Sequence, residues 1–224
     1  MSYARRRYRR RRRPSRFKKW NRRLSTANKA LKVAYGVKKL LNVEYKYFDD
    51  YVTNAAPTSA TIYNLSEIPQ GDGVTSRDGN QVKCVSIQFQ MYLRNNTQST
   101  RSCLYRVILF QVFSQDDTAP DWSDPEVGLL DFATIIAYRN LDGSARNRYK
   151  ILKDWKVILE KDAERGDKKI YRYYKKTNFR MRFGSSSTGQ PRKNSLYLLV
   201  IPQSVVGGYY PTMDYNIRLR YLDN

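Results

Sequence analysis

The sequence predicts an all-β protein, a single eight-stranded antiparallel jelly-roll sandwich preceded by a disordered basic N-terminal arm and a short helix. Three observations lead to this fold class. Positive charge is concentrated at the start of the 224-residue chain. The hydrophobic pattern changes from a helical period to a period of two after residue 42. No amphipathic segment long enough for a crossover helix lies between the later strands, so their sheets are expected to be antiparallel.

The first element is an arginine-rich arm over residues 1–23. Of the 21 residues in 3–23, 13 are Lys or Arg and none is acidic; the first acid in the chain is Glu44. Such a block of like charges repels itself and cannot bury a core, so the arm should be disordered when alone. Its expected partner is a polyanion, with nucleic acid as the leading candidate. The expected nucleic-acid-binding residues are Arg5, Arg6, Arg7, Arg9, Arg10, Arg11, Arg12, Arg13, Arg16, Lys18, Lys19, Arg22 and Arg23.

Aromatic residues are interleaved with these charges, at Tyr3, Tyr8, Phe17 and Trp20. Cations neutralise phosphates and aromatic rings stack on unpaired bases, so the pattern favours a single strand or a loop. A nuclear localisation signal is the simpler interpretation, and the two are compatible.

The second element is a short basic amphipathic helix over residues 24–42. Ser25 can cap it, and Ala27, Leu31, Ala34, Val37 and Leu41 recur at steps of three and four. Lys29, Lys32, Lys38 and Lys39 keep it basic. It can lie against nucleic acid, a partner's surface or, as a competing interpretation, a membrane surface.

The third element is the sandwich domain, residues 43–224. Val85, Ile87, Phe89, Met91 and Leu93 alternate with polar residues and predict a half-buried strand. Residues 103–113 and 196–201 are apolar on both faces, as central strands are. Further strands are expected at 43–52, 170–183 and 215–222, and as two short strands bent near Asp154 within 148–160. The interruption at 114–147 is expected to be a surface excursion with a helical turn near 126–137. The strands and turns together suit a double-sheet jelly roll.

The composition argues against an enzyme. The chain has no histidine, which removes triads and ordinary zinc sites that need His, and no glycine-rich phosphate loop. No catalytic residue, cofactor or metal is therefore expected. Acidic pairs at Asp49–Asp50 and within 116–126 are interpreted as turns and solvated surface, a structural cation in 116–126 being the alternative. Arg165-Gly166-Asp167 is read as a turn rather than a receptor motif.

The two cysteines, Cys84 and Cys103, lack metal-ligand spacing and are expected in the core of an intracellular chain. No run of about 18 apolar residues predicts a membrane span. The basic start is not followed by the apolar region of a signal peptide.

This layout resembles the capsid proteins of small circular single-stranded DNA viruses, the circovirus-like group, and the related satellite tobacco necrosis virus-like jelly rolls. The local match is best at "YKYFDD" (45–50) and at "NLSEIPQGDGVTSRDGNQVKCVSIQFQMYLRN" (64–95). The resemblance implies a T=1 icosahedral homo-oligomer of about 60 copies with arms inside, packaging viral single-stranded DNA or possibly RNA. It also implies a virion location, use of the host nuclear import machinery during assembly in the nucleus, and a cell-surface receptor of unknown kind.

Two rival functions explain the arm: a satellite-type RNA virus capsid, and a basic nucleic-acid-binding protein that never assembles. Phosphate contacts carry no base information, so the sequence hardly separates DNA from RNA cargo. A jelly-roll enzyme or lectin is a third rival, disfavoured by the arm and the missing histidines. Basic residues of late strands are expected either to add to the inner lining or to form a solvated or subunit-pairing face: Lys175, Lys176, Arg180, Arg182, Arg218 and Arg220.

Overall fold

The structure is a computed structural model of the whole chain, and it divides into two units, residues 1–43 and residues 44–224. The residues it describes are 25–26, 28–33, 45–96, 101–114, 120, 122–123, 128–142, 147–161, 167–184, 191–203 and 210–223. Within the expected helix, residues 25–26 and 28–33 are helical and exposed. The expected continuation over 34–41 and the arm at 1–23 lie outside the described residues, so the proposed boundaries at 23 and 42 stay predictions.

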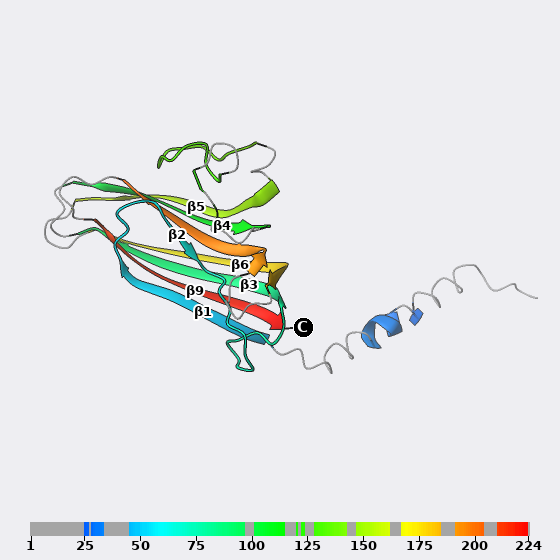
Figure 1. Cartoon of the computed structure of the whole chain (residues 1–224). Coiled ribbons are helices and arrows are strands. Elements are labelled where there is room, and N and C mark those ends of the chain that lie inside the picture. The colour runs from blue at the N-terminus through cyan, green and yellow to red at the C-terminus, as the bar shows by residue number, and fades with distance from the viewer. Residues whose placement is uncertain are drawn as a thin grey trace, which may run out of the picture. The chain divides into compact units, whose positions relative to one another are not determined.

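The second unit is a sandwich of two antiparallel sheets, which confirms the expected all-β jelly-roll-like fold (Figure 1). Across the five-stranded sheet the order is β1 (Tyr45–Ala55), β9 (Thr212–Asp223), β3 (Gln81–Arg94), β6 (Lys168–Phe183) and β7 (Pro191–Lys193). Across the four-stranded sheet it is β2 (Thr61–Asn64), β8 (Ser195–Pro202), β4 (Cys103–Val112) and β5 (Tyr149–Leu159). Neighbouring strands come from distant parts of the chain, so the fold depends on long-range pairing.

The main hydrophobic core lies between the two sheets. Alternate residues of β3 point into it, and Phe89 packs against Trp155 of β5 and Tyr215 of β9, with ring centroids 5.7 and 6.1 Å apart. Cys84 and Cys103 are buried in the same core as free thiols, as expected. The alternation seen in the sequence therefore reports which side of each strand faces the opposite sheet.

A second core explains why β4 and β8 are apolar on both sides. Ile108, Phe110, Tyr197 and Leu199 point away from the main core, and the segment 128–142 between β4 and β5 packs over them with Leu129, Leu130 and Ala137. Figure 1 shows this segment lying beside the four-stranded sheet. Strands β4 and β8 are thus buried on both faces, like the strands of a parallel sheet.

Arg106 fastens the 128–142 segment to β4. It is 3% exposed; its Nη1 donates to the carbonyl oxygens of Ile135 at 3.2 Å and Ala137 at 2.6 Å. Its Nε and Nη2 donate to both carboxylate oxygens of Asp154 on β5, at 3.2 and 2.8 Å. A bidentate pair of this kind fixes geometry as well as charge.

Three elements differ from the sequence-based expectations. Residues 149–159 form one continuous strand, and the expected bend is a bulge, where the pairing with β4 shifts between Leu109 and Phe110. The short strands β2 and β7 were not predicted. The expected helical turn near 126–137 is wrong for the described residues 128–137, where Leu130 instead bridges Arg139 in antiparallel fashion.

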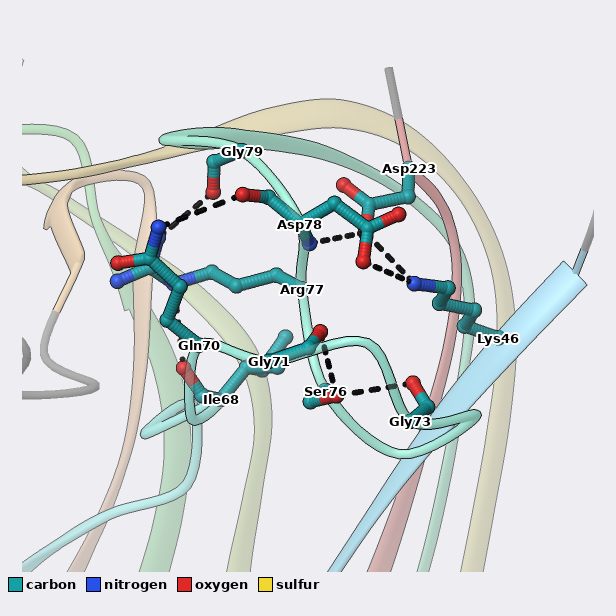
Figure 2. A network of polar contacts seen from close by, with 10 residues as sticks. All are labelled: Lys46, Ile68, Gln70, Gly71, Gly73, Ser76, Arg77, Asp78, Gly79 and Asp223. Carbon is teal, nitrogen blue, oxygen red and sulfur yellow. Dashed lines mark hydrogen bonds and ion pairs between the residues drawn. The ribbon is translucent and has the colours of Figure 1, made fainter.

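The turns between β2 and β3 are held by a buried polar network (Figure 2). Arg77 has no exposed surface, and its guanidinium donates to the carbonyl oxygens of Ile68 at 3.2 Å and Gly79 at 2.6 Å. The same group lies 4.2 Å from the centroid of the Phe183 ring. Because burial disfavours the charged form, the pKa of Arg77 is lowered from its usual value.

The network continues to the first and last strands of the sandwich. Lys46 of β1 donates to the Asp78 carboxylate at 2.7 Å and to the Asp223 carboxylate of β9 at 3.2 Å. The backbone N–H of Asp78 donates to the same Asp223 oxygen at 2.6 Å. The hydrogen bond to Asp78 is the main cause of the raised pKa of Lys46, and Asp223 adds to it. Lys46 therefore stays charged although it is only 5% exposed.

Candidate nucleic-acid interface

The outer face of the five-stranded sheet, here called the open face, is exposed and basic. The sandwich core covers the other face of this sheet, and on the outer face every second side chain of β6 reaches solvent. Its basic residues are Lys83, Arg94, Lys168, Arg172, Lys176, Arg180, Arg182, Lys193, Arg218 and Arg220. The acidic residues at the same register are Asp49 and Asp214. Sheet pairing thus gathers positive charge that is scattered along the sequence.

Five of the six late-strand basic residues that the sequence offered as a lining lie on the open face. These are Lys176, Arg180, Arg182, Arg218 and Arg220. The sixth, Lys175, is paired with the buried Ile87 and is half-buried on the opposite side of β6. Period-two alternation accounts for the split, because adjacent residues of a strand point to opposite faces.

A hollow of about 670 Å³ lies on the open face and crosses β1, β9, β3 and β6. In one row across the sheet, Tyr47 is paired with Arg220, which is paired with Ser86, which is paired with Lys176. The next row runs from Asp49 through Arg218 and Gln88 to Tyr174. The small Ser86 side chain stands between two long cations, so the middle of the first row is low and its sides are high.

A bulge at this point sets the floor of the hollow. The pairing of β3 with both β6 and β9 shifts between Cys84 and Ser86, and against β9 the shift leaves Val85 as an extra residue. Val85 lines the hollow and is half-buried, whereas the sequence had placed it in the core-facing row. Bulges bend a strand and re-aim its side chains, and alternation alone does not reveal them.

The cations of the hollow differ in how far they are already neutralised. Arg218 donates to both Asp49 carboxylate oxygens, at 2.7 and 2.6 Å, and its guanidinium lies 5.0 Å from the Tyr47 ring centroid. The hydrogen bond to Asp49 raises the pKa of Arg218. Lys176 and Arg220 make no ion pair with a carboxylate among the described residues. Two charges at the hollow are therefore available to an anion.

The Lys46 network presents the aromatic side of the hollow. Lys46 points inward to Asp78 and Asp223, so its neighbours Tyr45 and Tyr47 point outward, 65% and 38% exposed. The Tyr47 N–H also donates to the Val74 carbonyl oxygen at 3.2 Å. A prediction from hydropathy would bury the tyrosines and expose the lysine, and in β1 the opposite is found. No sequence signal marked these two tyrosines or Tyr174 as site residues.

Most of the other sequence candidates lie outside the described residues. The thirteen arm residues from Arg5 to Arg23 lie outside the described residues, as do the acids within 116–126. Asp49 pairs with Arg218, and Asp50 accepts a hydrogen bond from the Tyr215 hydroxyl at 3.3 Å while burial raises its pKa. No group of His, Cys, Asp or Glu that could hold a metal ion occurs among the residues described.

Of the Arg-Gly-Asp tripeptide, only Asp167 is described. Its carboxylate accepts the Glu160 N–H at 3.0 Å and pairs with Lys169 at 3.3 Å, and the bond from Glu160 is the main cause of its lowered pKa. The side chain thus links the residue after β5 to the residue before β6. Within the described part of the chain, no helix is long and apolar enough to cross a membrane.

Comparison with known proteins places the chain among viral coat proteins. The family model described as satellite tobacco necrosis virus coat protein matches residues 19–224. A solved structure of the cowpea mosaic virus top component, naturally occurring empty particles, is similar at 13% identity and a TM-score of 0.35. That similarity covers 78% of this chain and 85% of the other. No curated protein sequence matches.

The family match corrects one expectation and confirms another. The resemblance to capsid proteins of circular single-stranded DNA viruses is wrong, because the matching family is that of a satellite virus coat protein. A basic arm, a helix and a sandwich are expected of any coat protein that packages nucleic acid. Phosphate contacts carry no base information, so this order of elements could not separate the two virus groups. A coat protein is a component of the virion and not an enzyme, as the missing catalytic groups had indicated.

Proposed function

Because the chain belongs to the satellite tobacco necrosis virus coat protein family, we propose that it builds a closed shell around RNA, with the open face turned inward. The main support for this proposal is that the outer faces of the two sheets are covered to different extents. The outer side of β4 and β8 is covered by the 128–142 segment, whereas no described segment covers the open face, which is basic. A bare cationic sheet suits a surface that meets a polyphosphate inside a particle.

The arm adds a second, stronger source of charge. Residues 1–41 carry 17 Lys and Arg and no acid. In a T=1 shell of about 60 copies, these residues supply roughly a thousand positive charges, enough for about a thousand phosphates. Contact with phosphate releases condensed counterions and lowers repulsion between subunits, so RNA capture and assembly are coupled.

The cargo in this proposal is RNA. Satellite-type RNA virus capsids were the alternative left open by the sequence, and their family is the one that matches. Nuclear import by the arm has no counterpart in that match. No described residue is assigned to a cell-surface receptor.

The charge of the arm is tested by two matched variants of the full chain. In one, the thirteen Arg and Lys residues from Arg5 to Arg23 become Gln; in the other, the arginines among them become Lys, which keeps the charge. The Gln variant is expected to fold and to lose co-purifying nucleic acid, whereas the Lys variant keeps it. Absorbance ratios and electron micrographs of purified particles give the readout. Nucleic acid retained by the Gln variant contradicts the role of the arm.

The cargo and the orientation of the shell need separate measurements. Nucleic acid extracted from particles should be degraded by ribonuclease and resist deoxyribonuclease; the reverse result rejects RNA. For orientation, a bulky amine reagent that cannot enter the shell should modify Lys156 of β5, which pairs with Arg106 on the outer side of its sheet, and spare Lys168 and Lys176 until particles are dissociated. Labelling of Lys176 in intact shells would place the open face outside.

A further inference from the structure

We propose that the hollow on the open face holds an unpaired base of the packaged RNA, stacked on tyrosine, with the adjoining phosphates on Lys176 and Arg220. The inference rests on the proposed function and adds a defined contact to it. The hollow supplies three tyrosine rings, from Tyr45, Tyr47 and Tyr174, beside three cations, from Lys176, Arg218 and Arg220.

Size and exposure support a nucleotide as the occupant. The volume of about 670 Å³ falls in the range of sites for small organic ligands, which is about 300–1,000 Å³. Tyr45 and Tyr174 are 65% and 61% exposed, although they belong to a folded strand surface. Exposed aromatic rings next to cations form the stacking platform that binds bases without reading them.

The arrangement of the cations separates two kinds of contact. Arg218 is held by Asp49 and lies over Tyr47, so it stiffens the ring that receives the base. Lys176 and Arg220 flank Ser86 on the two neighbouring strands and have no carboxylate partner among the described residues. Strands are spaced about 4.8 Å apart, so the two cations lie on opposite sides of the hollow, roughly 10 Å from each other.

The chemistry selects a single strand over a duplex. Bases of a duplex are stacked on each other and offer only edges and backbone, so the tyrosines have nothing to stack on. The cations alone bind both forms. The site should therefore add affinity for unpaired RNA beyond the charge effect that the arm gives to any polyanion.

Two variant pairs of the full-length dissociated protein test the site against labelled oligo(A) and a duplex of equal length. Replacing Tyr47 and Tyr174 by Ser should weaken oligo(A) binding about tenfold or more and leave duplex binding unchanged. Replacing Lys176 and Arg220 by Gln should weaken binding of both, and for oligo(A) it should reduce the slope of log K against log salt by roughly 1.4. The control Tyr138→Ser removes an 83% exposed ring from the 128–142 segment and should change nothing.

Circular dichroism melts of all variants test whether they fold. If the tyrosine-to-serine variant does not fold, Tyr47→Leu with Tyr174→Leu takes its place, because leucine keeps apolar bulk but cannot stack as an aromatic ring. Equal loss for single strand and duplex in the tyrosine variants overturns the stacking role. Unchanged oligonucleotide binding with altered sedimentation overturns it as well, because a second copy of the chain then covers the hollow. Neither result alters the arm experiment, so failure of the site and failure of packaging are distinguishable.

Discussion

The two sheets of the sandwich are built by the same pairing rules and differ in what covers them. The four-stranded sheet has a core on each side, one shared with the other sheet and one under the 128–142 segment. The five-stranded sheet has a core on one side and the open face on the other. Strand β6 of that sheet alternates between exposed and covered residues, whereas nearly all residues of β4 and β8 are buried on both sides.

This difference shows that stability and interaction are assigned to separate surfaces. Substitutions in the doubly covered sheet are expected to act through packing and buried hydrogen bonds. Substitutions on the open face are expected to change binding and leave the free energy of unfolding nearly unchanged. Each prediction below measures one side of this comparison.

The largest effect is expected where the two sheets meet. Phe89→Asp places a charge among Trp155 and Tyr215, in a position with no exposed surface. A typical domain is stable by only about 5–15 kcal/mol, and burying an unpaired carboxylate uses up a large part of that free energy. We therefore expect no folded protein. Soluble expression and circular dichroism check this, with Gln88→Asp on the open face as the control. A folded Phe89→Asp protein would show that the strand register is wrong.

The second-largest effect on stability is expected at Arg106, which holds the 128–142 segment to β4. Arg106→Met leaves two carbonyl oxygens and Asp154 without their donor, and should lower the free energy of unfolding by about 3–5 kcal/mol. Arg172→Met on the open face should change it by less than about 0.5 kcal/mol. Urea titrations of the two variants give the comparison. Similar midpoints for both would mean that the 128–142 segment is not held by Arg106.

Alkaline pH should weaken the shared core next. Burial raises the pKa of Cys84 and Cys103 to about 11, against 9.0 in an exposed thiol. Above pH 9 the unfolded chain loses these protons before the folded chain does, so stability falls as pH rises, by about 1 kcal/mol per unit or more. Melting temperatures from pH 7 to 10.5 measure this. Rapid alkylation of the folded protein by iodoacetamide at pH 8 would contradict the protected thiols.

The smallest effect on stability is expected on the open face itself. Asp49→Asn removes the partner of Arg218, and because both groups are partly exposed the cost should be about 0–1 kcal/mol. The same change frees a cation, so binding of single-stranded RNA at low salt should strengthen. A slightly lower melting temperature together with tighter RNA binding would support separate surfaces for stability and for binding. A large loss of stability would contradict that separation.

Sequence reasoning reached the fold through local patterns. Alternation in β3 and the doubly apolar β4 and β8 correctly indicated a two-sheet sandwich, and the same alternation placed Arg218 and Arg220 on one side. It missed the hollow, because that depends on the Val85 bulge and on Tyr47, Arg220, Ser86 and Lys176 forming one row. Cross-strand register is set by distant residues, and the burial of Lys46 depends on Asp78 and Asp223, which lie 32 and 177 positions away.

The extra residue at Val85 also fixes the parity of strand β3. Before it, odd positions such as Lys83 face solvent; after it, even positions such as Gln88 and Gln90 do. Deleting Val85 without compensation would force one half of the strand to turn over. Either Lys83 would then face the sandwich interior in place of Cys84, or Gln88 would face it in place of Phe89. A length change of one residue here is therefore harsher than most point substitutions, and natural variants of this strand should keep its residue count between Val82 and Phe89.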